Sequence, residues 1–155
     1  MTIDEIIGFL DSLDGVLALR PGPGDGSPEI AWGDVFFYYA PDGQVPAKTQ
    51  PFATIVTKDY PGDEPSGLDR PGAFRLNISA GTEAFTEWTG RTPREANVDL
   101  TSSAADTVIA HPVYAPLGWL AVIDPGPRTA QPIRDLLRIA HERARGRARR
   151  HSGSH

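Results

Sequence analysis

The order of two hydrophobic periodicities along the chain limits its fold more than any other feature of the sequence. Near both ends, apolar side chains recur at every third or fourth position, which is typical of amphipathic helices. Between the ends lie short extended segments that follow one another instead of alternating with helices. This order favours an α+β fold with a largely antiparallel sheet. We predict about five strands, flanked by an N-terminal and a C-terminal helix.

Local signals place these elements along the chain. Thr2 and Glu5 have the spacing of a capping box, which predicts a first helix that ends before Gly15. Thr129 is a suitable N-cap for the last helix, and a short helix is expected over residues 82–88. The segments with strand character are residues 16–20, 30–40, 52–58, 74–79, 107–112 and 117–124.

The length of the chain suits one compact domain. A chain of 155 residues buries roughly 70% of the surface that it exposes when unfolded, so it forms a core without a metal or disulfide. We expect a single domain over residues 1–146 and a disordered basic tail over residues 147–155. Glycine (16) and proline (15) are frequent, and they predict long loops such as residues 21–28 and 59–73.

Charge is distributed unevenly along the sequence. Residues 1–128 carry 8 basic and 18 acidic side chains, a net charge of −10, whereas residues 129–155 carry 7 arginines and 2 acids, a net charge of +5. A basic helix end can bind nucleic acid, but the acidic body would repel a polyanion, so nucleic-acid binding is disfavoured. The chain begins with a helix pattern and shows neither a signal peptide nor an apolar membrane-spanning stretch. We therefore expect a cytoplasmic protein.

Several chemistries are excluded by residue type or spacing. The chain has no cysteine, which excludes thiol redox chemistry, thiolate metal sites and a cysteine nucleophile. The acids of the long loop, Asp59, Asp63, Glu64 and Asp69, follow no calcium-binding pattern, and solvated loop charges are the better interpretation. The glycine-rich segment 22–26 is followed by no lysine and no helix, unlike a phosphate-binding loop. We predict no metal and no cofactor.

Three longer segments carry a resemblance to a known family: Arg20–Asp34, Pro51–Glu64 and His111–Val122. Over Thr2 to about Arg145 the chain resembles the actinobacterial domain-of-unknown-function family 6194. That resemblance implies no activity, because the family is uncharacterised. The chain is more loosely similar to the MmcQ/YjbR-like proteins in its order of elements, Lys58, Trp119 and the final helix. This second resemblance implies a YjbR-like α+β fold, in a family discussed as DNA-binding.

His111 is the strongest candidate for chemistry. It is the only histidine outside the last helix and tail, and it ends a predicted strand next to a proline. Tyr114 and Trp119 follow closely and could form the apolar wall of a ligand pocket. We expect His111 to be partly accessible and to titrate, acting as an acid or base if the protein is an enzyme. The alternative is a structural histidine bonded to a backbone carbonyl.

Two further groups could bind a ligand. Lys58, Asp59 and Tyr60 lie where a strand meets the long loop, a common position for binding groups. Arg75 and Asn77 alternate with apolar residues, so they share one face of their strand and could hold a carboxylate or phosphate. Each group has a simpler interpretation: an edge lysine with a turn aspartate, and a solvated sheet face.

These observations leave three hypotheses open. The first is a small protein that binds a polar or anionic metabolite in an aromatic-lined cleft, with His111 as the acid or base of any reaction. The second is a nucleic-acid or protein interaction module that uses the arginines of the last helix. The third is a homo-oligomeric structural protein without a ligand.

Overall fold

The computed structural model describes residues 1–46, 48–59, 67–68, 70–95 and 104–152. Its elements follow the chain in this order: α1 (Ile3–Asp11), β1 (Val16–Leu19), the 3₁₀ turn η1 (Glu29–Ala31), β2 (Val35–Tyr39), β3 (Ala53–Val56), β4 (Arg75–Ile78), α2 (Thr82–Thr89), η3 (Pro93–Glu95), β5 (Val108–Ala110), η5 (Ala115–Leu117), β6 (Leu120–Ile123) and α3 (Ala130–Ser152). The α+β class predicted from the periodicities is confirmed.

The six strands form one antiparallel sheet in the order β1-β2-β3-β4-β6-β5. The first four strands are neighbours in both sequence and space. After β4 the chain leaves the sheet through α2 and returns at its edge as β5, and β6 then inserts between β4 and β5. The sheet therefore has one strand more than the predicted five, because each of the six segments with strand character contributes a strand.

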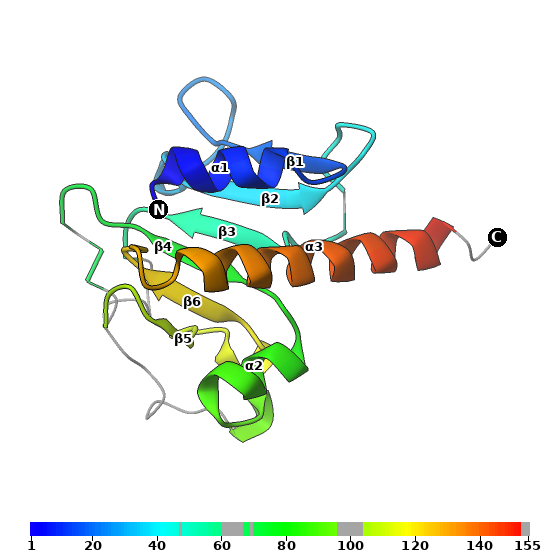
Figure 1. Ribbon diagram of the computed structural model, residues 1–155. Helices are drawn as coiled ribbons and strands as arrows, with labels where there is room; N and C mark the ends of the chain where they lie inside the picture. The colour runs from blue at the N-terminus through cyan, green and yellow to red at the C-terminus, as the bar shows by residue number, and fades with distance from the viewer. Residues whose placement is uncertain (47, 60–66, 69, 96–103, 153–155) are drawn as a thin grey trace.

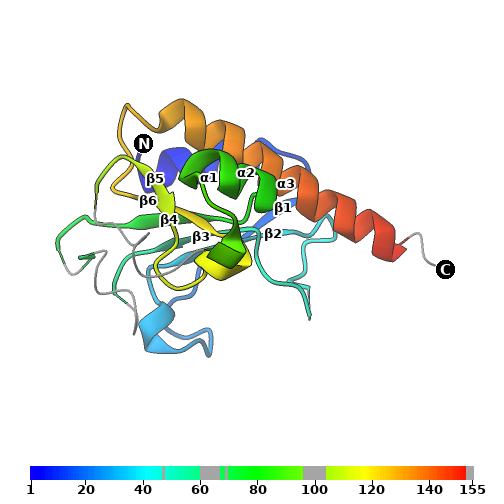
Figure 2. The ribbon, with the colours of Figure 1, turned by 90° about the horizontal axis from the view of Figure 1, so that it is seen from below.

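All three α-helices lie on one side of the sheet (Figures 1 and 2). Alternate residues of every strand point to this side and pack with Ile6 and Leu10 of α1 and Leu137 of α3 in the main hydrophobic cluster. A second, smaller cluster lies on the opposite face and includes Val56, Leu68 and Ala121. The segment around η1 also lies on this opposite side (Figure 2). The face without helices is thus the part of the sheet that is free to form a site.

The first helix begins where the capping box predicts. The Thr2 hydroxyl accepts a hydrogen bond from the Glu5 backbone N–H at 3.1 Å, and the Glu5 carboxylate accepts one from the Thr2 N–H at 3.0 Å. The helix ends at Asp11, and Gly15 then adopts a left-handed φ of 69° in the turn to β1. A Cβ at Gly15 would lie 2.8 Å from the Tyr39 ring, so this turn requires glycine.

The structure corrects the predicted boundaries of two elements. The expected strand over residues 30–40 is a strand only from Val35, because Gly33 takes a left-handed φ of 89° and separates η1 from β2. The helix α3 continues to Ser152, so residues 147–152 of the expected disordered tail are helical, and residues 153–155 lie outside the described residues. Arginine and alanine, which dominate this segment, both have high helix propensity.

Asp106 anchors the start of α3 from a distance in sequence. Its carboxylate accepts hydrogen bonds from the backbone N–H groups of Gly126, Arg128 and Thr129 and from the Thr129 hydroxyl, at 2.6 to 3.0 Å. Burial alone would raise the pKa of Asp106, but these hydrogen bonds outweigh it and lower the pKa to about 2. The carboxylate therefore caps the turn that leads into α3, and the Thr129 hydroxyl donates to it.

We expect Asp106→Ala to lower the free energy of unfolding by about 1–2 kcal/mol, the usual cost of losing a helix cap. Because the folded-state pKa lies below the ordinary 3.8, the contribution is complete above pH 4 and is lost as the pH falls toward 2. Asp106→Asn is the matched control, since it keeps one acceptor and tolerates the left-handed backbone of this residue, where φ is 49°. Urea unfolding at pH 7 and pH 3 measures both effects, and equal loss for Ala and Asn would contradict the cap assignment.

Candidate functional site

A cavity of about 620 Å³ opens on the face of the sheet that the helices leave uncovered. Its volume is within the range of small-molecule sites, roughly 300–1,000 Å³. The residues that line it are Ile30, Ala31, Phe36, Gln50, Pro51, Thr54, Val56, Arg75, Asn77, His111, Val113, Tyr114, Leu117 and Trp119.

Strand register builds the floor of the cavity. Phe36 of β2 pairs with Thr54 of β3, Thr54 pairs with Asn77 of β4, and Asn77 pairs with Ala121 of β6. Paired residues of adjacent strands project to the same face, so these side chains form one row across the sheet. Arg75, two residues before Asn77 on the same strand, also projects to this face, as the alternation in the sequence predicted.

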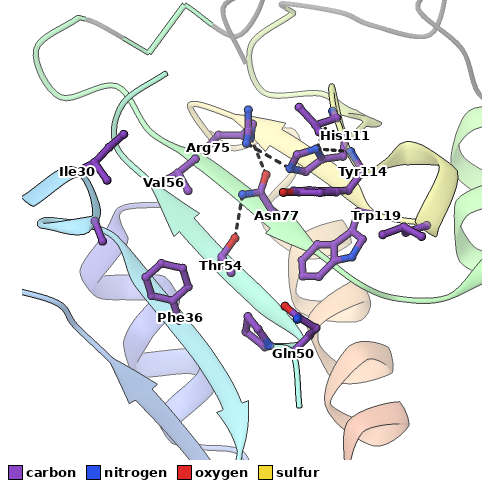
Figure 3. Close-up of a pocket in the computed structure, with 14 residues that line it drawn as sticks. Ile30, Phe36, Gln50, Thr54, Val56, Arg75, Asn77, His111, Tyr114 and Trp119 are labelled. Carbon is purple, nitrogen blue, oxygen red and sulfur yellow. Dashed lines mark hydrogen bonds between the residues drawn. The ribbon is translucent and has the colours of Figure 1, made fainter. Parts of the chain in front are cut away.

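A continuous series of polar contacts crosses this floor (Figure 3). The Asn77 amide nitrogen donates to the Thr54 hydroxyl at 2.9 Å, and the Asn77 oxygen accepts from Nε of Arg75 at 2.6 Å. An Nη of Arg75 lies 3.2 Å from Nε2 of His111. Arg75 is only 1% exposed and Asn77 only 2%, so the solvated-face interpretation of this pair is wrong. Their polar groups make hydrogen bonds to one another in place of water.

The backbone around His111 fixes which ring nitrogen carries the proton. Nδ1 of His111 lies 3.0 Å from the backbone nitrogens of both Val113 and Tyr114. Backbone N–H groups only donate, so Nδ1 accepts and the proton of the neutral ring is on Nε2. Nε2–H therefore faces the N–H groups of Arg75, which also only donate. The two side chains therefore meet donor to donor at the floor of the cavity.

Burial and the nearby Arg75 charge lower the pKa of His111 to about 3. The ring is 4% exposed and stays neutral throughout the physiological range. The expectation that His111 is partly accessible and titrates is therefore wrong. Its position at the strand end is as predicted, but Tyr114 packs against the ring at a centroid distance of 5.0 Å and Trp119 at 6.4 Å, and the segment after β5 covers it.

The mouth of the cavity is apolar and exposed. Among the lining residues, Leu117 is 72% exposed, and Ile30, Val113 and Tyr114 are also exposed. These four residues come from η1 and from the segment after β5, which lie on opposite sides of the opening (Figure 3). Exposed apolar side chains that gather around a concave site commonly contact a ligand or a partner. We refer to Ile30, Val113, Tyr114 and Leu117 as the apolar rim.

Comparison with known proteins gives the family of the chain. The model of a family of unknown function, DUF6194, matches residues 1–153. The chain belongs to this family. No curated protein and no solved structure matches the chain significantly. Within the part of the DUF6194 chain that the structure describes, no helix is long and apolar enough to cross a membrane.

The predicted ligand-binding residues divide into two groups in the DUF6194 structure. Arg75, Asn77, His111, Tyr114 and Trp119 all line the cavity, whereas Lys58 and Asp59 do not. Lys58 instead donates to the buried carboxylate of Asp34 at 3.0 Å and to the Trp32 carbonyl at 2.9 Å. Asp59 accepts from the Leu68 backbone at 2.9 Å and so holds the base of the long loop. Tyr60 lies outside the described residues.

Sequence reasoning did not identify Thr54, Phe36 and Gln50 of the cavity, nor three members of the apolar rim. Thr54 carries a usable signal, because it is the one polar residue of its otherwise apolar strand and occurs at even spacing from Val56. The rim residues carry none, since exposed apolar residues in loops are common. Of the acids weighed for a cation, Asp63, Glu64 and Asp69 lie outside the described residues, and no group of three metal-ligating side chains occurs within the described ones.

Proposed function

We propose that this protein binds a small anionic metabolite in the cavity, with Arg75, Asn77 and His111 at its floor. One observation carries the proposal: the buried guanidinium of Arg75 and the ring of His111 lie together at the base of a largely apolar cavity. A cationic side chain at the base of such a cavity attracts oxygen anions, which form charge-assisted hydrogen bonds. The apolar surroundings strengthen such bonds by excluding water.

The same geometry favours binding over acid or base catalysis by His111. Nδ1 already accepts two backbone hydrogen bonds, so it cannot also take a proton from a substrate. A pKa of about 3 leaves the ring neutral near pH 7, so it is not a proton donor in the way of a general acid. The role that fits both facts is a neutral hydrogen-bond donor, held in one orientation by the backbone.

A charge at the mouth of the cavity tests the proposal without disturbing its floor. We expect Leu117→Glu to weaken the binding of anions by about tenfold at low ionic strength, and less at high salt, because the new charge repels them. The side chain is mostly exposed, so the fold should be retained. Ile139→Glu is the matched control, since Ile139 is an exposed apolar residue of α3 that does not line the cavity.

The measurement is a thermal-shift screen of carboxylate and phosphate metabolites, followed by calorimetric titration of each hit. Hits that bind the natural chain and Ile139→Glu equally, but Leu117→Glu more weakly, would support the proposal. Hits that bind all three proteins equally would place the ligand elsewhere and contradict it.

The arginine-rich end of α3 supports the second hypothesis, a nucleic-acid or protein interaction module, because this end extends past the strands (Figure 1). Several of its arginines, however, already contact the chain itself. Arg138 lies over the Phe9 ring at 5.1 Å, Arg143 donates to the Ser79 carbonyl at 3.2 Å, and Arg145 pairs with Glu142 at 3.3 Å. These contacts favour a structural role for the basic helix.

We therefore expect duplex DNA to bind weakly and only at low salt. The acidic body opposes a polyanion, and few phosphate contacts mean that counterion release contributes little affinity. Fluorescence anisotropy with a labelled 20-base-pair duplex measures this. Submicromolar binding at 150 mM salt that is abolished by removing residues 143–155 would instead support the interaction module.

A further inference from the structure

We propose that the ligand of this cavity has an aromatic ring with an uncharged oxygen substituent, a hydroxyl or a ring carbonyl, which the hydroxyls of Thr54 and Tyr114 bind. The inference rests on the proposed function for the place of the ligand and adds the chemistry of its uncharged part. The geometry that carries it is a hydroxyl donor of Thr54 that faces the cavity between the rings of Phe36 and Trp119.

Two hydrogen bonds fix what the Thr54 hydroxyl can do. Nε of Arg75 only donates, so the side-chain oxygen of Asn77 is the atom that faces it, at 2.6 Å. The amide nitrogen of Asn77 therefore donates to the Thr54 oxygen at 2.9 Å, and the hydroxyl hydrogen of Thr54 points away from Asn77. Within the part of the chain that the structure describes, the Thr54 hydroxyl has no second partner, and its side chain lines the cavity. A ligand atom that accepts a hydrogen bond would satisfy it.

The hydroxyl of Tyr114 supplies a second group for the same ligand atom. Figure 3 shows the Tyr114 side chain entering the cavity with its hydroxyl directed toward the side where Asn77 lies. This hydroxyl makes no hydrogen bond to any residue that the structure describes. It can donate to the oxygen that accepts from Thr54, or accept from that oxygen where it is a hydroxyl. Neither side chain brings a charge, so an uncharged oxygen suits this place better than an ionised one.

Aromatic rings flank the Thr54 hydroxyl. Phe36 pairs with Thr54 across β2 and β3, so its ring stands beside this hydroxyl on the same face of the sheet. Trp119 comes directly before β6 and lies on the other side of Thr54 (Figure 3). A flat ring packs against two such side chains through offset or edge contacts, which a saturated ring does not make. The oxygen that Thr54 binds therefore belongs on an aromatic ring.

Three uncharged probes separate the oxygen from the ring. They are 2-naphthol, 2-methylnaphthalene, which has a methyl group in place of the hydroxyl, and decahydro-2-naphthol, which has the hydroxyl on a saturated body. Ligand-observed NMR titration of the full chain at pH 7 and 150 mM salt gives each affinity. Because the probes differ in hydrophobicity, the test is the fold-change in affinity that each variant causes with each probe.

We expect Tyr114→Phe to weaken the binding of 2-naphthol about fivefold and Thr54→Val about tenfold, and neither to change the affinity for 2-methylnaphthalene by more than about twofold. Thr54→Ser keeps the hydroxyl and should bind 2-naphthol like the natural chain. Phe36→Leu should weaken 2-naphthol about fivefold and decahydro-2-naphthol by less than about twofold. Tyr114 is 51% exposed, so Tyr114→Phe keeps its fold and tests the oxygen even if Thr54→Val does not fold.

The outcomes distinguish this inference from the proposed function. Equal effects of Tyr114→Phe and Thr54→Val on 2-naphthol and 2-methylnaphthalene would overturn the oxygen substituent. Equal effects of Phe36→Leu on 2-naphthol and decahydro-2-naphthol would overturn the aromatic ring. Failure of 2-naphthol to bind at millimolar concentration would overturn the whole inference, while metabolite hits sensitive to Leu117→Glu would keep the proposed function. If 2-naphthol behaves as expected but the metabolite screen gives no anionic hit, the proposed function fails and the inference about the aromatic ring and its oxygen stands.

Discussion

Replacing Arg75 by methionine is expected to weaken the binding of the anionic hits of the metabolite screen by about a hundredfold, because truncating one partner of a buried charged contact costs roughly 2–5 kcal/mol. The same change should lower the free energy of unfolding by about 2 kcal/mol. Methionine fills much of the volume of this fully buried side chain, but it leaves the Asn77 oxygen without its donor at 2.6 Å. Calorimetric titration and urea unfolding measure the two effects separately.

Two variants control the Arg75 experiment. Arg70→Met removes an arginine that pairs with Asp124 at 2.9 Å near the surface, away from the cavity, and should leave the binding of these hits unchanged. Arg75→Lys keeps the charge but loses the planar fork, so we expect affinity between those of the natural chain and Arg75→Met. Binding by folded Arg75→Met or Arg75→Lys that equals the natural chain would show that the guanidinium does not hold the ligand.

The second large effect concerns the stability of the fold. We expect Asp34→Ala to lower the free energy of unfolding by about 2–3 kcal/mol. The Asp34 carboxylate is fully buried and accepts from the Thr57 backbone and hydroxyl and from Lys58, at 2.9 to 3.0 Å. Its removal leaves these donors without that acceptor. This loss of unfolding free energy is smaller than that expected for a fully buried ion pair, because the Lys58 side chain is 28% exposed.

Conservative variants separate charge from hydrogen bonding at this pair. Asp34→Asn keeps an acceptor for Thr57 and should cost less than Asp34→Ala, and Lys58→Met should cost about 1 kcal/mol, since the lysine is partly exposed. Urea unfolding gives these values. Because Lys58 does not line the cavity, the anionic hits of the screen should bind Lys58→Met and the natural chain equally. A large loss of affinity in Lys58→Met would show that Lys58 belongs to the binding site.

The sequence could predict more about Arg75 and Asn77 than about Lys58. The face shared by Arg75 and Asn77 follows from a strand period of two, which is a local property of the backbone. Lys58 also lies after a strand, but its position depends on Asp34, which is 24 residues away. No local pattern shows that pairing. The sequence therefore predicted that Lys58 lies at the end of a strand, but not that its ammonium bonds a buried carboxylate.

The chemical state of His111 shows a similar limit. Its place at the end of β5 and its closeness to Tyr114 and Trp119 could be predicted from sequence spacing. Its burial could not, because it depends on the turn through η5, which returns over the ring, and on Arg75 from another strand. The same non-local contacts that lower the pKa of His111 also place it at the cavity floor. His111 therefore lines the cavity although it is buried.

The ring-nitrogen NMR spectrum of His111, recorded at pH 5 and pH 7 with and without a saturating anionic hit of the metabolite screen, tests the central claim most directly. We predict a neutral ring with its proton on Nε2 at both pH values, and a shift of the Nε2 resonance when the hit is added. Adding the hit should not shift the resonances of His141, a residue of α3 that bonds the Asp14 carbonyl. A His111 ring that gains a proton between pH 7 and pH 5, or an Nε2 resonance unchanged by the bound hit, would contradict a neutral donor at the floor of an anion site.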